Sequence, residues 1–462
     1  MVASPTVSVK PPSASPNSPA APVRAIGFWG GLSANLLNMI GIGPFITIPL
    51  MLSAMGGPQA LLGWGLGAIL CAFDGLVWAE LGSALPHSGG TYHYLREAFG
   101  SAKLGRLFGF IFLWQSLLLG PLAIASAAVG SAAYTTFLFP HLHAGQLTAI
   151  AAVVCLVNTA LLYRDVGSIE RLSITVGALV VASLGWILVN GAVHFNAKLA
   201  FDFPAGAFHL NHAFWVGLGA ATLIGVYDYG GYNNVCMIGG EIKTPQKTIP
   251  AAVLISIAVV AALYVGLNLS ILGVVPWRAA MQSRTIAADF MQTLYGRSGG
   301  IVVAIMILIA GWGGGVACLL GYSRIPYAAA ACGDFFKVFA RLHPKGRFPT
   351  VSLVFIGVAS AVACFISLQA LIDATIVIQA MFQFLLQCLA VVMLRRRRLE
   401  GPQTFRMPLY PLPLIITALG WLYIVVTSPP AQIAIGASVF LTGAAAFLIR
   451  ARIQGTWPFR TA

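Results

Sequence analysis

Charged residues are scarce in this sequence. Asp, Glu, Lys and Arg make up 8% of the 462 residues, whereas a soluble domain contains about a quarter. Hydrophobic residues make up 58%, and the mean hydropathy is +0.87. No soluble fold can bury so much apolar surface, so the sequence excludes a soluble globular protein and places the body of the chain in a lipid bilayer.

The sequence also lacks the patterns of metal, nucleic-acid and catalytic sites. Its seven cysteines form no CxxC pair, and the neighbouring His141 and His143 have no carboxylate partner in their short loop, so we expect no metal and no cofactor. The net charge of +14 arises from basic residues in the joints between apolar segments, which argues against a nucleic-acid partner. None of the eight histidines lies deep in an apolar segment, so we expect no enzymatic activity.

What the sequence does contain is a series of apolar stretches, each long enough to cross a bilayer, which takes about 20 residues. They predict an all-α polytopic membrane protein of about twelve transmembrane helices. The expected spans are 26–54, 58–84, 105–138, 145–163, 166–194, 212–238, 248–274, 299–323, 350–371, 373–394, 408–427 and 431–450. Residues 1–24 are rich in Pro, Ser and Ala and are predicted to form a disordered cytoplasmic tail.

The distribution of Lys and Arg predicts the orientation in the membrane. If the N-terminus is inside, all but four of the 26 basic residues fall in inner segments, and the four on the outer side are Lys198, Arg278, Arg284 and Arg297. Cytoplasmic loops of membrane proteins carry such an excess of basic residues. We therefore expect a multi-pass protein of the cytoplasmic (inner) membrane with both termini in the cytoplasm.

Two of the expected spans contain helix-breaking residues near their middle. In the first, Gly41, Gly43 and Pro44 lie within the run from Ile40 to Phe45, and neither glycine nor proline favours a helix interior. In the sixth, Gly230 and Gly231 lie within the run 227–234. Glycines also permit close helix packing, but two breaks at matching depths favour a binding site, because non-helical backbone in a membrane must face protein or a watery cavity.

The positions of the breaks predict how the chain is divided. Interrupted helices at corresponding places in two halves are typical of inverted repeats with a site at the midplane. We expect a first repeat of helices 1–5 in residues 25–195 and a second of helices 6–10 in residues 212–394. Residues 395–462 then form helices 11 and 12 and the cytoplasmic C-terminus.

A pair of breaks suits a zwitterionic ligand. Free amide groups at the start of a half-helix attract a carboxylate, while free carbonyls attract an ammonium group. The predicted substrate-binding residues flank the two breaks, and they are Ile40, Gly41, Ile42, Gly43, Tyr227, Asp228, Tyr229 and Gly230.

Four sequence blocks resemble the amino acid, polyamine and organocation (APC) family of transporters. The first block is Ile40-Gly41-Ile42-Gly43-Pro44-Phe45, and the second is the stretch from Trp78 to Tyr92, which contains Ala79-Glu80-Leu81-Gly82 and Pro86-His87-Ser88-Gly89-Gly90. The third is the stretch from Tyr229 to Gln246, which contains Gly230-Gly231-Tyr232-Asn233 and Gly240-Glu241-Ile242-Lys243. The fourth is the stretch from Ser323 to Pro344. The likeness covers most of residues 26–430. It implies a leucine-transporter-like fold of five plus five helices and an alternating-access permease, in which the amides of Gly41 to Gly43 receive the substrate carboxylate and the carbonyls of Tyr227 to Gly230 receive its amino group.

The sequence departs from the family pattern at two places. Several members have a lysine in the fifth helix, where this chain has Thr175-Val176-Gly177-Ala178, which argues against a lysine-based proton switch. Pro44 stands where the family usually has Ile, so the shape of the carboxylate site is expected to differ.

Two acidic residues lie deep in expected spans, and a charge at the bilayer centre is costly. Asp228, beside the second break, either binds an ammonium group or carries a proton, or else it is a packing carboxylate. Asp74 is expected to make a structural hydrogen bond, with a proton relay as the alternative. Glu80 and Glu241 lie near cytoplasmic helix ends, where pairing with Arg or Lys would stabilise a closed inner gate.

The sequence therefore predicts a secondary active transporter of amino acids or related amines, bound to the lipid bilayer. Two alternatives remain: a polyamine or cationic amino acid transporter that uses Asp228, and a transporter-like sensor that does not transport. The solute, any coupling proton and the oligomeric state stay open.

Overall fold

The computed structural model describes residues 23–163, 166–398, 401 and 404–459. The described chain is helical and contains isolated bridges but no strand. Nine of its helical segments are long and apolar enough to cross a membrane, and α15 (Thr350–Ala363) and α18 (Leu412–Thr427) are shorter apolar helices. The prediction of an all-α polytopic membrane protein is confirmed. Of the predicted tail, residues 1–22 lie outside the described residues.

The other elements of the body are long helices, two of which form the broken first span. They are α1 (Phe28–Ile40), α2 (Gly43–Met55), α3 (Leu61–Ala84), α5 (Leu104–Leu138), α6 (Ala144–Leu161), α7 (Val166–Val193), α9 (His212–Tyr229), α11 (Pro245–Leu272), α13 (Ile286–Tyr322), α16 (Leu368–Ile378), α17 (Leu385–Arg396) and α19 (Pro430–Ile453). Short helices occupy the joints, and they are α4 (Thr91–Ala98), α8 (Ala197–Ala200), α10 (Asn234–Met237), α12 (Trp277–Ala280) and α14 (Arg324–Ala331).

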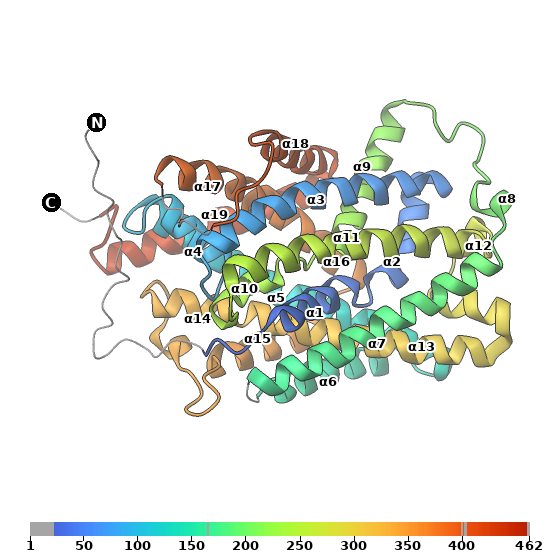
Figure 1. The fold of residues 1–462 in the computed structure, drawn as a ribbon, viewed down its shortest axis with the longest axis horizontal. Helices are drawn as coiled ribbons and strands as arrows, with labels where there is room; N and C mark the ends of the chain where they lie inside the picture. Colours follow the sequence, from blue (N-terminus) through green and yellow to red (C-terminus); the bar gives the residue numbers. More distant parts are fainter. Residues whose placement is uncertain (1–22, 164–165, 399–400, 402–403, 460–462) are drawn as a thin grey trace.

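The long helices run roughly along the long axis of the molecule (Figure 1). The short helices α4 and α14 lie at one end, and α8 and α12 lie at the other (Figure 1). The broken span α1–α2 packs against α7, α9, α11 and α13, so it lies inside the bundle. This placement brings the first break close to helices from both halves of the chain.

Several predicted boundaries were wrong. The eighth helix was expected at 299–323, but α13 begins at Ile286, and its kink at Gly296, with φ of 67°, marks the start of the expected span. The ninth helix, expected to reach 371, ends at Ala363. The short helices α4 and α14 lie in joints between the expected spans, where no helix was expected, because eight residues are too few for a hydropathy signal.

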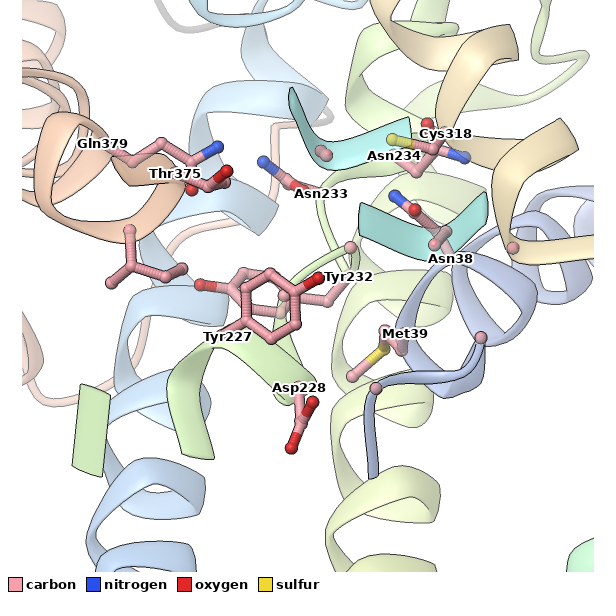
Figure 2. Close-up of a pocket in the computed structure, with 18 of the residues that line it drawn as sticks. Asn38, Met39, Tyr227, Asp228, Tyr232, Asn233, Asn234, Cys318, Thr375 and Gln379 are labelled. Carbon is pink, nitrogen blue, oxygen red and sulfur yellow. The ribbon is translucent and has the colours of Figure 1, made fainter. Parts of the chain in front are cut away.

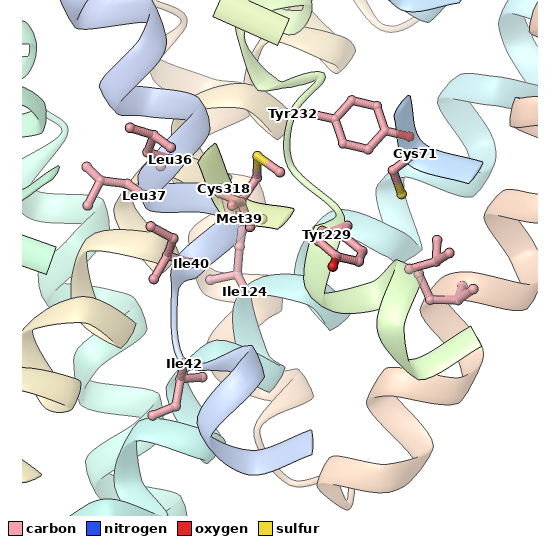
Figure 3. Packing of buried hydrophobic residues seen from close by; sticks show 14 of the residues in the cluster. Leu36, Leu37, Met39, Ile40, Ile42, Cys71, Ile124, Tyr229, Tyr232 and Cys318 are labelled. Atoms are coloured by element: carbon pink, nitrogen blue, oxygen red, sulfur yellow. The ribbon is translucent and has the colours of Figure 1, made fainter. Parts of the chain in front are cut away.

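The core around the first break consists of apolar side chains. Leu36, Leu37, Met39 and Ile40 of α1 point into this core, and Ile42 follows them in the break (Figure 3). In a bilayer such packing, and not the exclusion of water, holds helices together. The close packing fixes the position of the non-helical backbone between α1 and α2.

Candidate substrate site

The first break lies between Ile40, where α1 ends, and Gly43, where α2 begins. Gly41 has φ of 31° and ψ of −133°, a conformation that costs a residue with a side chain far more than glycine. Pro44 stands in the first turn of α2, where its missing N–H costs no helical hydrogen bond. The predicted break is present, and it places the N-terminus of a half-helix inside the bundle.

The second break begins three residues later than predicted. Tyr227, Asp228 and Tyr229 belong to the last turn of α9, and the backbone leaves the helix at Gly230, with φ of −55° and ψ of 144°. Gly231 follows with φ of 113°, a region that favours glycine. The glycine pair, and not the preceding tyrosines, therefore determines where this span breaks.

Two asparagine side chains connect the second break to neighbouring spans. Asn35 of α1 donates to the Tyr232 carbonyl at 2.6 Å and accepts from the Val235 amide at 2.8 Å. Asn234 donates to the Ala317 carbonyl of α13 at 3.0 Å. Unsatisfied backbone groups are costly in a membrane, so these side chains stabilise the break. An Asn inside an apolar span was the signal that the sequence interpretation missed.

Glycines allow three spans to meet at the breaks. A Cβ atom on Gly231 would lie 2.9 Å from Asn38 of α1, and one on Gly314 of α13 would lie 2.9 Å from the Gly41 Cα atom. Real Cβ atoms essentially never make such short contacts. The eighth span therefore packs directly against the first break.

A cavity of about 110 Å³ lies where the two breaks meet. Six of the eight predicted substrate residues line it, and they are Gly41, Ile42, Gly43, Tyr227, Asp228 and Gly230. Ile40 and Tyr229 do not line it. The Tyr229 ring instead packs against Trp64 and Tyr264, with centroid distances of 5.6 and 5.5 Å.

The cavity also contains polar residues that sequence reasoning missed. They are Asn38, Asn233, Asn234, Thr375 and Gln379 (Figure 2). Gln379 begins a π-helical turn that ends at Phe384, and such turns are frequent at functional sites. Its amide donates to the Tyr322 hydroxyl at 3.0 Å. The spacing of Thr375 and Gln379, four residues apart in an apolar helix, was the available signal.

Asp228 lies at the edge of this group of polar residues. Its carboxyl group accepts a hydrogen bond from Thr47 of α2, and its side chain is 1% exposed. Figure 2 shows it apart from Asn38, Asn233 and Gln379. The nearby Tyr227 hydroxyl shares a 2.7 Å hydrogen bond with Ser126 of α5. Asp228 thus joins the sixth span to the second half of the first.

The other acids singled out from the sequence lie away from the cavity. Asp74 accepts hydrogen bonds from the Tyr232 hydroxyl at 2.5 Å and from the Trp421 ring N–H at 3.2 Å, so the predicted structural hydrogen bond is present. Glu241 forms a buried ion pair with Arg324, with N···O distances of 2.7 and 3.1 Å.

Glu80 forms a second ion pair at its helix end. It pairs with Arg395 at 2.6 and 2.7 Å. The expected pairing of both glutamates with arginine is therefore present. The Glu80–Arg395 pair connects α3 to α17, and the Glu241–Arg324 pair connects the segment after α10 to α14. The helix α14 lies together with α4 at one end of the molecule (Figure 1).

The fifth span offers no amine to the first break. Val176 of α7 packs near Gly313, where a Cβ atom would lie 2.8 Å from its side chain, and a Cβ atom on Gly177 would lie 3.2 Å from Ser33. At these two described positions, α7 meets α13 and α1 with an apolar side chain and a glycine.

A bundle of apolar helices around a cavity at two helix breaks is the architecture of a secondary transporter. The chain belongs to the amino acid permease family, which matches residues 26–449. The resemblance drawn from the four sequence blocks is confirmed.

Three relatives illustrate the range of this family. The serine/threonine exchanger SteT of Bacillus subtilis (strain 168) is 25% identical over 410 residues, which cover 87% of this chain and 90% of that protein. The large neutral amino acids transporter small subunit 2 of Mus musculus is 27% identical over 440 residues, with coverage of 92% and 81%. The cationic amino acid transporter 4 of Mus musculus is 25% identical over 389 residues, with coverage of 79% and 59%. These relatives are transporters and not enzymes.

Proposed function

We propose that this permease moves an amino acid across the cytoplasmic membrane by alternating access, with the substrate held in the cavity between the two breaks. The observation that carries the proposal is the convergence of both breaks on one cavity. Of the amides from Gly41 to Gly43, that of Gly41 donates to the Leu37 carbonyl at 3.2 Å, so the amides of Ile42 and Gly43 at the start of α2 receive the carboxylate. The carbonyls at the end of α9, from Tyr227 to Gly230, receive the amino group.

The cavity wall favours a neutral amino acid. Apart from Asp228, its polar side chains are uncharged amides and hydroxyls, such as Asn233, Thr375 and Gln379. The relatives carry names for serine and threonine, large neutral and cationic substrates, so the family alone does not select among them. A cationic amino acid or a polyamine, held by Asp228, is the second candidate, and its support is the one acidic side chain at the cavity.

The proposed orientation places both termini in the cytoplasm. It is supported by the basic residues of α4, α5, α14 and α17, whose ion pairs gather at one end of the bundle. The Lys198 and Arg278 side chains belong to α8 and α12 at the other end (Figure 1). We further propose that helices 1–5 and 6–10 form two inverted repeats, since each begins with a broken span, and that the Glu241–Arg324 pair closes the inner gate.

Uptake and exchange in proteoliposomes test this function. The purified protein is reconstituted, and uptake of radiolabelled L-serine, L-leucine, L-lysine and putrescine is measured with and without unlabelled solute inside. We expect uptake of at least one neutral amino acid, inhibited by an excess of the same unlabelled amino acid outside. Uptake of L-lysine or putrescine alone would favour the second candidate. Binding without uptake or exchange would indicate a sensor and contradict the proposal.

A further inference from the structure

The carboxyl group of Asp228 has a buried oxygen that the proposed substrate contacts do not explain. Oxygen Oδ2 accepts a hydrogen bond from Thr47 Oγ1, but Oδ1 has no hydrogen-bond partner among the described residues. The side chain is almost fully buried. Buried polar groups nearly always have a partner, so an unmatched oxygen at the substrate cavity requires an explanation.

No positive charge compensates this carboxyl group within the described part of the chain. Asp228 takes part in no ion pair there, and α1 and α2, which flank the first break, contain no titratable residue. Titratable groups on its own helix and on the other neighbouring helices are His212, Tyr227 and Tyr229 of α9, Cys71, Asp74 and Glu80 of α3, Tyr264 and Lys247 of α11, Asp373 of α16, and Tyr423 of α18.

None of these groups neutralises Asp228. The Tyr264 hydroxyl donates to the Met39 carbonyl at 2.7 Å and lies 3.5 Å from the Asp228 backbone carbonyl. Asp74 is bonded to Tyr232 and Trp421. Lys247 is in the first turn of α11, nearly five helical turns from Tyr264 along the same helix, and His212 begins α9, more than four turns from Asp228. An ionised Asp228 would therefore be a buried charge with a hydrogen bond from Thr47 but with no cationic side chain beside it among the described residues, an arrangement that is costly.

The carboxyl oxygen Oδ1 packs closely against the start of α2. A Cβ atom on Gly43 would lie 2.3 Å from Oδ1, so this oxygen rests directly on the backbone at the start of α2. Between Asp228 and α2 an ammonium group would displace the half-helix, whereas a hydrogen on the carboxyl group needs little extra room. Figure 2 shows the carboxyl group apart from the amide side chains on the opposite side of the cavity.

We propose that Asp228 is the proton-binding site that couples transport to the proton gradient, an inference that rests on the function proposed above. The carboxylate takes up one proton from the water on the side to which the cavity is open and becomes a carboxylic acid. It keeps this proton while the cavity is closed and releases it to water on the other side. One O–H bond forms and the same bond breaks, so each cycle moves one proton with the substrate.

The contact with Thr47 links this proton to the motion of the helices. Asp228 belongs to the sixth span and Thr47 to the second half of the first, so their hydrogen bond joins the two broken spans. Loss of the proton would leave a carboxylate whose Oδ1 has no hydrogen-bond partner among the described residues, and water that enters the open cavity would supply one. Protonation thus favours the closed cavity, and deprotonation favours opening.

Proton movement in proteoliposomes tests the proposal. Vesicles containing a pH-sensitive dye receive radiolabelled L-serine, L-leucine or L-lysine, and uptake is followed with and without an inward proton gradient. The wild-type protein is expected to take up its substrate severalfold faster with the gradient and to acidify the lumen. In Asp228→Asn, uptake is expected to be independent of the gradient, without acidification. Asp74→Asn, which alters the other membrane aspartate, is expected to retain both responses.

The outcomes separate this proposal from the proposed function. If the wild-type protein takes up none of the three amino acids, the proposed function fails. Substrate uptake without proton movement in the wild-type protein, or proton movement that persists in Asp228→Asn, overturns only the proton site. Thr47→Val is expected to shift the pH of half-maximal uptake, and Thr47→Ser to restore it.

Infrared spectroscopy decides the case if Asp228→Asn does not transport. The closed, substrate-free wild-type protein is expected to show a carbonyl band of a protonated carboxylic acid that is absent from Asp228→Asn and present in Asp74→Asn. Identical carboxylic acid bands in the wild-type protein and Asp228→Asn would overturn the proposal.

Discussion

At the scale of single residues, small side chains determine the shape of the site. Gly43 supports the carboxyl group of Asp228, and Gly314 supports Gly41, in both cases at distances that leave no room for a Cβ atom. Gly41 and Gly231 in addition have positive φ angles. The glycines that the sequence marks as helix breakers thus serve a second purpose, which is close approach of one span to another.

Replacement of Gly43 by alanine is predicted to impair transport. The new methyl group would lie 2.3 Å from Asp228 Oδ1, so the start of α2 must move away from α9. Displacement of about 1 Å in a binding site can reduce activity on the order of a hundredfold, and we expect an uptake rate at least tenfold lower. The matched control is Gly65→Ala on α3, where a Cβ atom meets nothing within 4 Å. Equal uptake rates for both variants would contradict this role of Gly43.

At the scale of helices and joints, ion pairs hold the elements of one end together. The Arg324 and Glu241 side chains are 2% and 1% exposed, and Asp334 accepts from both Arg106 of α5 and Tyr92 of α4. Arg450 of α19 donates to the Gly333 carbonyl at 2.9 Å. Helices far apart in the sequence are therefore fastened to the segment that follows α14.

Arg324→Met is predicted to destabilise the protein strongly. The substitution leaves Glu241 as a buried charge without its partner, which typically costs about 3–5 kcal/mol. The measurement is the free energy of unfolding in detergent, from denaturant titration. Arg278→Met removes the exposed ion pair with Asp202 and is expected to cost less than about 1 kcal/mol. Similar losses in both variants would refute the distinction between buried and exposed pairs.

His93 of α4 makes stability depend on pH at the same end of the molecule. Burial, together with the nearby His87 and Arg96, lowers the pKa of His93 to about 3, below the value of about 6.5 for an unfolded chain. Its contribution to stability is therefore fully present above about pH 6.5 and is lost as the pH falls toward 3. The loss of melting temperature between about pH 7 and pH 4.5 should be smaller in His93→Gln than in the wild-type protein. An unchanged loss would show that His93 does not titrate in this way.

The sequence allowed the long helices to be predicted and left most of the site unseen. Long apolar runs identify spans because few other structures bury them, and glycine pairs identify the breaks. The polar wall formed by Asn233, Thr375 and Gln379 was missed because isolated amides and hydroxyls in apolar helices have many structural uses. The Asp228 side chain points toward Thr47 because α2 packs against α9. No local sequence pattern predicts how these two helices pack.

At the scale of the whole molecule, the ends of the bundle differ in their charged residues. One end has the arginine pairs of Glu80, Glu241 and Asp334, while the described part of the other end has the exposed Arg278–Asp202 pair. The orientation proposed above places the end with the arginine pairs in the cytoplasm, because cytoplasmic loops typically carry an excess of basic residues.

Cysteine labelling checks this orientation. In spheroplasts, an impermeant thiol reagent is predicted to label Lys198→Cys from outside and to label Arg452→Cys only after the membrane is permeabilised. Of the native cysteines, Cys332 is partly exposed and the other six are buried, so the unmodified chain serves as the background. Labelling of Arg452→Cys in intact spheroplasts would invert the proposed orientation.

The central claim is that the two breaks form one substrate site in a working permease. It is tested most directly by exchange of labelled amino acids in proteoliposomes, with Gly231→Ala compared with Gly65→Ala. A Cβ atom at Gly231 would lie 2.9 Å from Asn38, in a backbone conformation that favours glycine, whereas one at Gly65 meets nothing within 4 Å. We predict that the wild-type protein and Gly65→Ala exchange at least one neutral amino acid and that Gly231→Ala does not. Equal exchange by all three proteins, or exchange by none, would contradict the account.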